Sequence, residues 1–222
     1  GDPVELARRY ADEGIDELSF LDIGATPESR HCLFGVLERV ARELFIPLSA
    51  GGGLRTVADM VRMLSSGADK VVVGSAALAR PELLGEAAER LGSQAVVLSL
   101  DARSSGPGTW EARACSGRSS GGRDALDWVR EAVARGAGEI LVNSIDRDGT
   151  RTGFDLELTR AVSRAVPVPV IASGGGGTLA HLVEALREGE ADAVLVASLL
   201  HRDGVGVQTI KNYLREQGVN VR

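Results

Sequence analysis

The chain has 222 residues, of which 44% are hydrophobic, and its formal net charge is −6. A chain of this size buries a large core without disulfide or metal support, and an acidic balance without any basic run argues against a nucleic-acid partner. The two cysteines, Cys32 and Cys115, fit a reduced protein better than a disulfide framework or a zinc site. No apolar run approaches the length of a membrane span and no signal peptide is visible, so we expect a soluble cytoplasmic protein.

The first predicted element is a helix over residues 2–14, which has a proline near its first turn and a glycine after its last. Short apolar runs then alternate with amphipathic patterns. The predicted strands cover residues 17–23, 46–51, 70–75, 95–101, 139–145, 169–174 and 193–198, and the plainest further helices cover 56–67, 124–136 and 178–189. Strands buried on both faces and alternating with helices predict a parallel sheet covered by helices. Residues 103–122, with their Gly-Pro-Gly punctuation, predict a β-hairpin on a long loop.

Two stretches of the chain repeat each other. "IPLSAGGG…GADKVVVGSAAL" and "VPVIASGGGG…EADAVLVASLL" each run strand, glycine turn, helix, strand. Asp69 and Asp192 hold equivalent places, 123 residues apart (192 − 69). We therefore predict a (βα)8 TIM barrel with a two-fold repeat, in which one domain over 1–222 contains half-barrels at approximately 1–102 and 123–222. A solenoid is the alternative, and two copies at this long period argue against it.

The chain begins with a helix, and seven strands are counted where a closed barrel has eight. We therefore expect the first barrel strand to be absent from this chain. Three explanations are open: the chain was cut ahead of Gly1, the barrel stays open, or another chain fills the gap. We favour the first.

The carboxyl ends of the strands carry the chemistry of such barrels. Asp101 ends an apolar strand, so we predict that it is a general acid/base; a helix cap or a loop hydrogen bond is the alternative interpretation. Other polar residues at strand ends predict a substrate mouth, made of Asp22, Asn143, Ser144 and Asp148. No set of residues has the spacing of a metal site, and we expect neither metal nor cofactor.

Each repeated half also offers a glycine turn and, one strand later, a pair of small residues. These pairs are Gly74-Ser75 and Ala197-Ser198. Backbone N–H groups without a nearby Cβ approach an anion closely, so we predict two phosphate sites for a substrate with a phosphate at each end. Tight turning alone is the alternative explanation of the glycines.

A third set of polar residues begins alternate strands, at the opposite end of the sheet: Glu17, Lys70 and Glu139. Side chains from alternate strands share a layer inside a barrel. The set is either a structural salt-bridge ring or a polar gate at the barrel floor. The histidines, His31, His181 and His201, fall on helices or late loops, and we assign them no catalytic role.

The phrases "GDPVELA", "LDIGAT", "GADKV", "RGAGEIL", "SIDRDGT", "IASGG" and "YLREQGVNVR" together resemble one family over nearly the whole chain. It is the cyclase subunit of imidazole glycerol phosphate synthase. The resemblance implies a lyase of histidine biosynthesis that takes a bis-phosphorylated formimino-aminoimidazole carboxamide ribotide and ammonia. Its products are imidazole glycerol phosphate and aminoimidazole carboxamide ribotide. It also implies a heterodimer, in which a glutaminase on the amino-terminal face of the barrel sends ammonia through a channel.

The resemblance carries over to individual residues. It makes Asp101 the catalytic aspartate of the fifth barrel strand and places Asp69 where the partner docks. One phosphate site is matched by Gly53, Gly74 and Ser75, the other by Gly149, Gly175, Ala197 and Ser198, and three of four residues at the ammonia entrance by Glu17, Lys70 and Glu139. Gly74 departs from the family, since many members have asparagine there.

The larger departure is the first strand, which in the family carries a second catalytic aspartate and the fourth gate residue. Asp22 is no substitute for that aspartate, because it matches a different position. We therefore expect this chain alone to be inactive or nearly so. Two alternatives are open: the sister phosphoribosyl isomerase of the same pathway, on a similar repeated barrel, and a non-catalytic phosphate-binding barrel.

Overall fold

Helix α1 (Pro3–Asp12) begins as the sequence predicts, since the carboxylate of Asp2 accepts the backbone N–H of Val4 at 2.7 Å. In this computed structural model the described residues are 1–24, 34–115 and 117–222, so His31 and Cys32 lie outside them. The described residues form two compact units. Unit 1 is Gly1–Leu98 with Arg135–Gly138, and unit 2 is Ser99–Ala134 with Glu139–Arg222. The prediction of one domain with two half-barrels stays a prediction.

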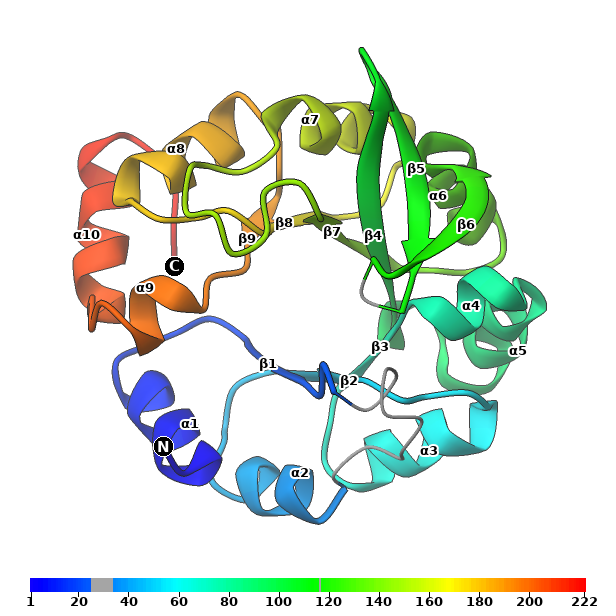
Figure 1. Cartoon of the computed structure of the whole chain (residues 1–222). Helices are drawn as coiled ribbons and strands as arrows, with labels where there is room; N and C mark the ends of the chain where they lie inside the picture. Colours follow the sequence, from blue (N-terminus) through cyan, green and yellow to red (C-terminus); the bar gives the residue numbers. More distant parts are fainter. Residues whose placement is uncertain (25–33, 116) are drawn as a thin grey trace. The chain divides into compact units, whose positions relative to one another are not determined.

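Unit 1 contains a parallel sheet in the order β1-β2-β3-β4, with helices on one side of its strands (Figure 1). Every residue of β2 is buried, whereas those of β1 are half-buried or exposed. Met60, Met63 and Leu83 pack fully buried on the helices that cover the sheet. After α1 the elements are β1 (Leu18–Leu21), α2 (Phe34–Ala41), β2 (Leu48–Gly51), α3 (Val57–Ser65), β3 (Lys70–Val73), α4 (Ser75–Ala79), α5 (Glu82–Leu91), the 3-10 turn η1 (Ser93–Ala95) and the start of β4 (Val96–Gly106).

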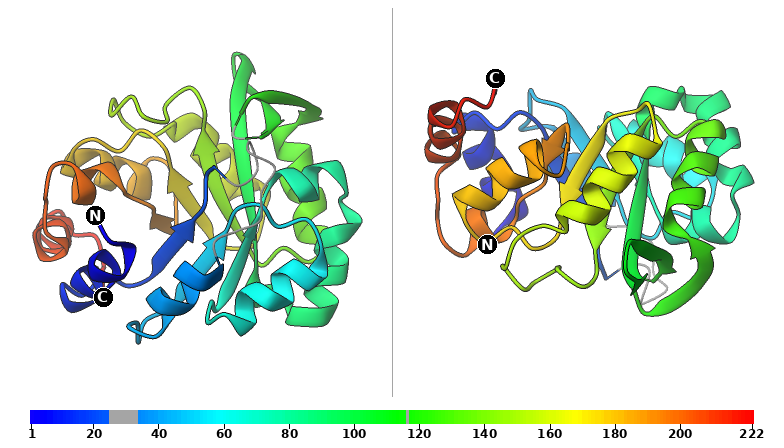
Figure 2. Two further views of the ribbon diagram at one scale, coloured as in Figure 1. Left: turned by 60° about the horizontal axis from the view of Figure 1, so that its bottom comes forward. Right: turned by 90° about the horizontal axis from the view of Figure 1, so that it is seen from above.

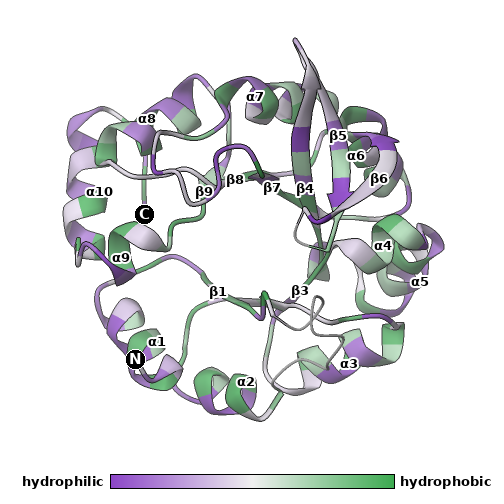
Figure 3. Ribbon diagram, in the orientation of Figure 1, coloured by the Kyte–Doolittle hydropathy of each residue, from purple (hydrophilic) through white to green (hydrophobic). Residues whose placement is uncertain are grey.

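Unit 2 continues with β4, and its parallel strands follow the order β4-β7-β8-β9. Trp128, Leu158 and Leu182 are fully buried on its helices, whose apolar faces turn toward the strands (Figure 3). Its elements are β5 (Thr109–Ala114), β6 (Ser119–Asp124), α6 (Ala125–Ala134), β7 (Glu139–Ser144), α7 (Leu156–Ala165), β8 (Val170–Ser173), α8 (Leu179–Arg187), β9 (Ala193–Val194), α9 (Ser198–His201) and α10 (Val207–Glu216).

The region of the predicted hairpin differs from the sequence-based boundaries. Strand β4 does not end at Asp101 but runs on to Gly106, pairs antiparallel with β5, and β5 pairs with a third strand, β6. The extended ribbon projects past the end of β7 (Figure 2). The extension follows from pairing with β5, and the carboxylate of Asp146, which accepts the N–H of Ser104 at 2.7 Å, supports the lengthened strand.

The predicted fold class is confirmed: parallel strands alternate with helices as in a (βα)8 TIM barrel, and the two-fold repeat extends to single hydrogen bonds. In unit 1 the Asp69 carboxylate accepts the N–H of Leu48 at 2.8 Å; in unit 2 that of Asp192 accepts the N–H of Val170 at 2.9 Å. Each aspartate also donates its own N–H to the carbonyl of the same partner. The "AD" that precedes a strand in both halves therefore ties its start to the neighbouring strand.

None of the helices in the described part of the chain is long and apolar enough to cross a membrane.

Candidate functional site

Asp101 lies on β4 in unit 2, partly buried, beside the carboxyl end of β7. Asn143, on β7, donates a hydrogen bond from Nδ2 to Oδ1 of Asp101 at 2.9 Å. The two residues meet because β4 and β7 are neighbours, and the N–H of Ile145 bonds the carbonyl of Ala102 at 2.9 Å. Two predicted site residues 42 positions apart in sequence are thus in direct contact.

The environment of Asp101 favours the protonated form of its carboxyl. Burial raises the pKa of the Asp101 carboxyl above its ordinary value, and the negative charge of Asp148 adds to this effect. The hydrogen bond from Asn143 works in the opposite direction, because it stabilises the charged form. A carboxyl with a raised pKa holds a proton more readily than an exposed carboxylate does, which suits a general acid/base.

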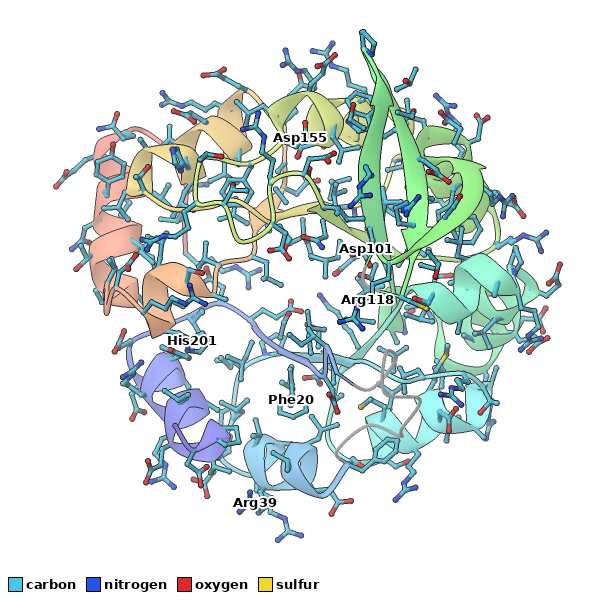
Figure 4. The ribbon with its side chains drawn as sticks, viewed as in Figure 1. Phe20, Arg39, Asp101, Arg118, Asp155 and His201 are labelled. Carbon is cyan, nitrogen blue, oxygen red and sulfur yellow. The ribbon has the colours of Figure 1, made fainter. Side chains whose placement is uncertain are left out.

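The other two predicted mouth residues of unit 2 differ from each other. Ser144 is buried, with 1% of its surface exposed, and its hydroxyl bonds the Asp155 carboxylate at 3.0 Å. Asp155 also caps α7, through the N–H of Leu158 at 3.0 Å (Figure 4). Asp148 is exposed, and its N–H bonds the Ser144 carbonyl at 2.8 Å. Ser144 therefore anchors the loop that presents Asp148.

The glycine turn of each half has the same backbone geometry. In unit 1, Gly52 and Gly53 have positive φ angles of 106° and 69°; in unit 2, Gly174 and Gly175 have 83° and 99°. A Cβ on Gly52 would lie 2.3 Å from the carbonyl oxygen of Asp22, so this turn packs directly on a predicted mouth residue. Gly149 has a positive φ of 74° and nothing within 4 Å of its would-be Cβ, consistent with an open backbone on the loop after β7.

The small pairs start short helices in both halves. Gly74 precedes α4 and Ala197 precedes α9, with φ angles of −125° and −124°, and neither has a side chain that caps the helix. Ser75 and Ser198 are therefore first residues of helices and not last residues of strands, which is why β3 and β9 end before the predicted limits. The duplicated arrangement leaves helix amino ends without side-chain caps where phosphates are predicted.

The predicted gate residues lie at the opposite ends of the strands. In unit 1 the ammonium of Lys70 contacts the carboxylate of Glu17 at 2.9 Å, with side chains 20% and 29% exposed. Glu139 belongs to unit 2, where it begins β7. A lysine–glutamate pair is thus present at the floor.

Arg118 is a candidate that the sequence did not point to. Its neighbour Gly117 is buried, and a Cβ there would lie 2.6 Å from Cδ1 of Ile145, so the turn after β5 packs on the end of β7. The Arg113 guanidinium also holds the Gly117 carbonyl, at 3.3 Å. The exposed Arg118 lies on the turn after β5, the strand whose Arg113 pairs in register with Asp101, and its label is beside that of Asp101 in the view of Figure 4; it forms no ion pair within the described ranges. A lone arginine after a glycine in a loop gives no sequence signal.

His181 has a structural role that the sequence also did not show. Its Nδ1 accepts the N–H of Gly177 at 3.2 Å, so the ring fixes the end of the glycine turn in unit 2. That hydrogen bond requires the proton of the neutral ring to be on Nε2. His181 thus supports the turn from the first turn of α8.

Comparisons with known proteins identify the family of the chain. A family model for histidine biosynthesis proteins matches residues 1–205. Over 222 residues the chain is 57% identical to the imidazole glycerol phosphate synthase subunit HisF of Myxococcus xanthus (strain DK1622), and the match covers 100% of this chain and 87% of that protein. The chain therefore belongs to the histidine biosynthesis protein family, as a homologue of the cyclase subunit HisF.

Proposed function

We propose that the chain catalyses the cyclase reaction: a bis-phosphorylated formimino-aminoimidazole carboxamide ribotide and ammonia give imidazole glycerol phosphate and aminoimidazole carboxamide ribotide. The observation that carries the proposal is the Asp101 carboxyl, held by Asn143 beside the carboxyl end of β7 and with its pKa raised by burial. Closure of the imidazole ring requires removal and delivery of protons. Asp101 acts as the general acid/base in that transfer.

The substrate's two phosphates bind at the two repeated turns. One site is formed by Gly53, Gly74 and Ser75; the other by Gly149, Gly175, Ala197 and Ser198. The support for this assignment is the matched geometry of the two halves: paired positive-φ glycines, followed by a helix start without a side-chain cap. Arg118 adds a positive charge for the anionic substrate. Asp22, Asn143, Ser144 and Asp148 form or support the mouth.

A glutamine amidotransferase binds the amino-terminal face and supplies ammonia past Glu17, Lys70 and Glu139. Unit 1 presents a hollow of about 350 Å3 there, lined by the end of α2, the start of β2 and Asp69. Phe45 lines this hollow and is 98% exposed. An exposed aromatic ring beside a hollow is typical of an interaction surface. We place this activity in the cytoplasm, which cell fractionation tests.

Turnover with excess ammonium tests the proposed reaction. The assay compares this chain, a form extended at its amino end by about 30 residues, which is one strand and a loop, and the Myxococcus xanthus relative as a positive control. We expect turnover from the extended form and a loss of it with Asp101→Asn. Two results would contradict the proposal. One is isomerisation of the preceding metabolite without cyclisation; the other is binding of the phosphate ester without turnover in both forms.

A further inference from the structure

We infer that Asn143 is a positioning residue for Asp101: its amide, seated against Gly174, holds one carboxylate oxygen and leaves the other for the reacting atoms. The catalytic consequence rests on the proposed function. The contact itself is a property of the folded chain and can be tested without any turnover.

The position of the Asn143 amide is set by the backbone on both sides. Asn143 lies on β7 opposite Ser173 of β8, and the next residue along β8 is Gly174, with a φ of 83°. A Cβ on Gly174 would come within 2.7 Å of Oδ1 of Asn143. The glycine therefore leaves the space in which the amide oxygen sits, and Nδ2 faces Asp101.

This orientation gives the two oxygens of Asp101 different roles. Oδ1 accepts the N–H of Asn143 at 2.9 Å, whereas Oδ2 has no hydrogen bond from that amide. An oxygen that already accepts a strong donor is the poorer site for a proton. The transferable proton is therefore directed to Oδ2, and the carboxylate is kept in one rotamer.

The internal repeat shows that packing alone does not require asparagine at this position. Gly52 lies against Asp22 in the first half as Gly174 lies against Ser144 in the second, and the corresponding residues of the two pairs are 122 positions apart (174 − 52 and 144 − 22). The residue before Asp22 is Leu21, so leucine fills the equivalent strand position. In the second half the same position carries the amide that contacts Asp101.

The test is a titration of the Asp101 carboxyl by NMR in the 222-residue chain, with carbon-13-labelled aspartate and Asp101→Asn for assignment. Asn143→Leu keeps the volume and the residue type of the first half but removes the donor. We expect the Asp101 midpoint to rise by about one pH unit, because a hydrogen bond to a charged group is lost. Asn143→Asp should give a coupled titration in two steps.

Two further variants separate positioning from packing. Asn212→Leu on α10, an exposed asparagine that accepts a hydrogen bond from Arg215, is the matched control and should leave the Asp101 midpoint unchanged. Gly174→Ala should move the midpoint in the same direction as Asn143→Leu, although Asn143 is intact. Thermal melts identify any variant that fails to fold, and the remaining variants then decide the result.

An Asp101 midpoint that does not move in folded Asn143→Leu and Asn143→Asp would overturn the inference. In the extended form, Asn143→Leu should also shift the acid limb of the kcat profile upward with little change in KM. If the extended form without substitutions shows no cyclase turnover but the Asp101 midpoint responds as expected, the proposed function fails and the positioning contact stands.

Discussion

At the scale of single residues, Asp101 is balanced between opposing influences. Burial and the Asp148 charge favour its neutral form, and the amide of Asn143 favours the charged form. Its place within β4 beside the carboxyl end of β7, with one donor, therefore combines influences that favour each of its two protonation states, as the proposed acid/base role requires.

Asp101→Asn should reduce kcat by about 100-fold or more, with little effect on KM, because general acid/base groups contribute about 10²–10⁴-fold. The shape is conserved, so substrate binding is retained. The measurement is steady-state turnover with ammonium on the amino-terminally extended form. Unchanged kcat would assign the proton transfer to another group.

The same substitution should stabilise the fold at high pH. A raised pKa means that the folded state binds a proton more tightly than the unfolded state, so its contribution is favourable below the unfolded pKa and is lost as pH rises through the folded pKa. Asp101→Asn removes that loss, because asparagine carries no charge. We therefore expect the Tm of the variant to be higher than that of the unchanged chain, and the difference to be larger at pH 8 than at pH 4. Each 1 kcal/mol of added stability should raise the Tm by about 2–4 °C.

Arg118→Ala should raise KM for the bis-phosphorylated substrate, by about tenfold for the loss of one charge-assisted contact of roughly 1.5 kcal/mol, and leave kcat nearly unchanged. The matched control is Arg130→Ala, since Arg130 is exposed on α6 and pairs only with a residue of its own helix in the contacts described, Asp127 at 3.0 Å. Added salt should reduce the difference in KM between the Arg118→Ala variant and the unchanged protein, because it screens the charge. Equal KM values at low salt would remove Arg118 from the site.

The residues could be predicted from sequence to different degrees. Asp101, the glycine turns and the small pairs follow apolar runs, and periodicity locates such runs, although β4 continues past Asp101 and the small pairs begin helices. Arg118 could not be found this way, because its place depends on Gly117 packing against Ile145, a contact between residues 28 positions apart (145 − 117). Ser144 was expected in the mouth because it stands at the end of a predicted strand. Its hydrogen bond to Asp155, the residue that caps α7, could not be predicted, because hydrophobic periodicity does not reveal a contact between two polar side chains.

At the scale of elements, the repeat explains why the fold was predictable. Both halves contain the same strand, positive-φ turn and capped helix: Thr56 accepts the N–H of Asp59 ahead of α3, and Thr178 accepts that of His181 ahead of α8. Patterns that occur twice reinforce each other. The extension of β4 to Gly106 escaped prediction because it depends on pairing with β5 and not on burial.

Asp69→Ala and Asp192→Ala should each lower the free energy of unfolding by about 1–3 kcal/mol, because each leaves the N–H at the start of a neighbouring strand without its acceptor. Equal losses in urea unfolding would show that the two halves use the aspartate alike. The control is Asp127→Ala, whose side chain is 79% exposed and which should change stability by less than about 0.5 kcal/mol. If the urea midpoint of both variants equals that of the unchanged chain, the prediction is wrong and water replaces the carboxylate as the acceptor of the strand N–H.

At the scale of the whole molecule, the two ends of the parallel strands differ in chemistry. The carboxyl ends carry Asp101, the glycine turns and Asp148. The amino ends carry the Lys70–Glu17 pair and the hollow beside Phe45. The proposed function assigns substrate chemistry to the carboxyl ends and nitrogen supply to the amino ends.

Two exposed apolar residues of unit 1 allow this division to be tested directly. Phe45 precedes β2 and is 98% exposed, and Ile23 follows β1 and is 80% exposed. Because β1 and β2 are parallel, the two side chains belong to opposite strand ends. Phe45→Ser should weaken glutaminase binding at least about tenfold, as truncation of an aromatic anchor does at protein interfaces, whereas Ile23→Ser should leave the binding unchanged.

Both variants are made in the extended form and assayed together with its glutaminase. Turnover is measured with each of two nitrogen sources, glutamine and ammonium. Phe45→Ser should lower glutamine-dependent turnover and keep ammonium-dependent turnover, because the carboxyl-end site is untouched and only the supply is lost. Calorimetric titration of the two subunits gives the affinity independently. Loss of binding with Ile23→Ser and not with Phe45→Ser would place the partner at the carboxyl ends and reverse the assignment of the two faces.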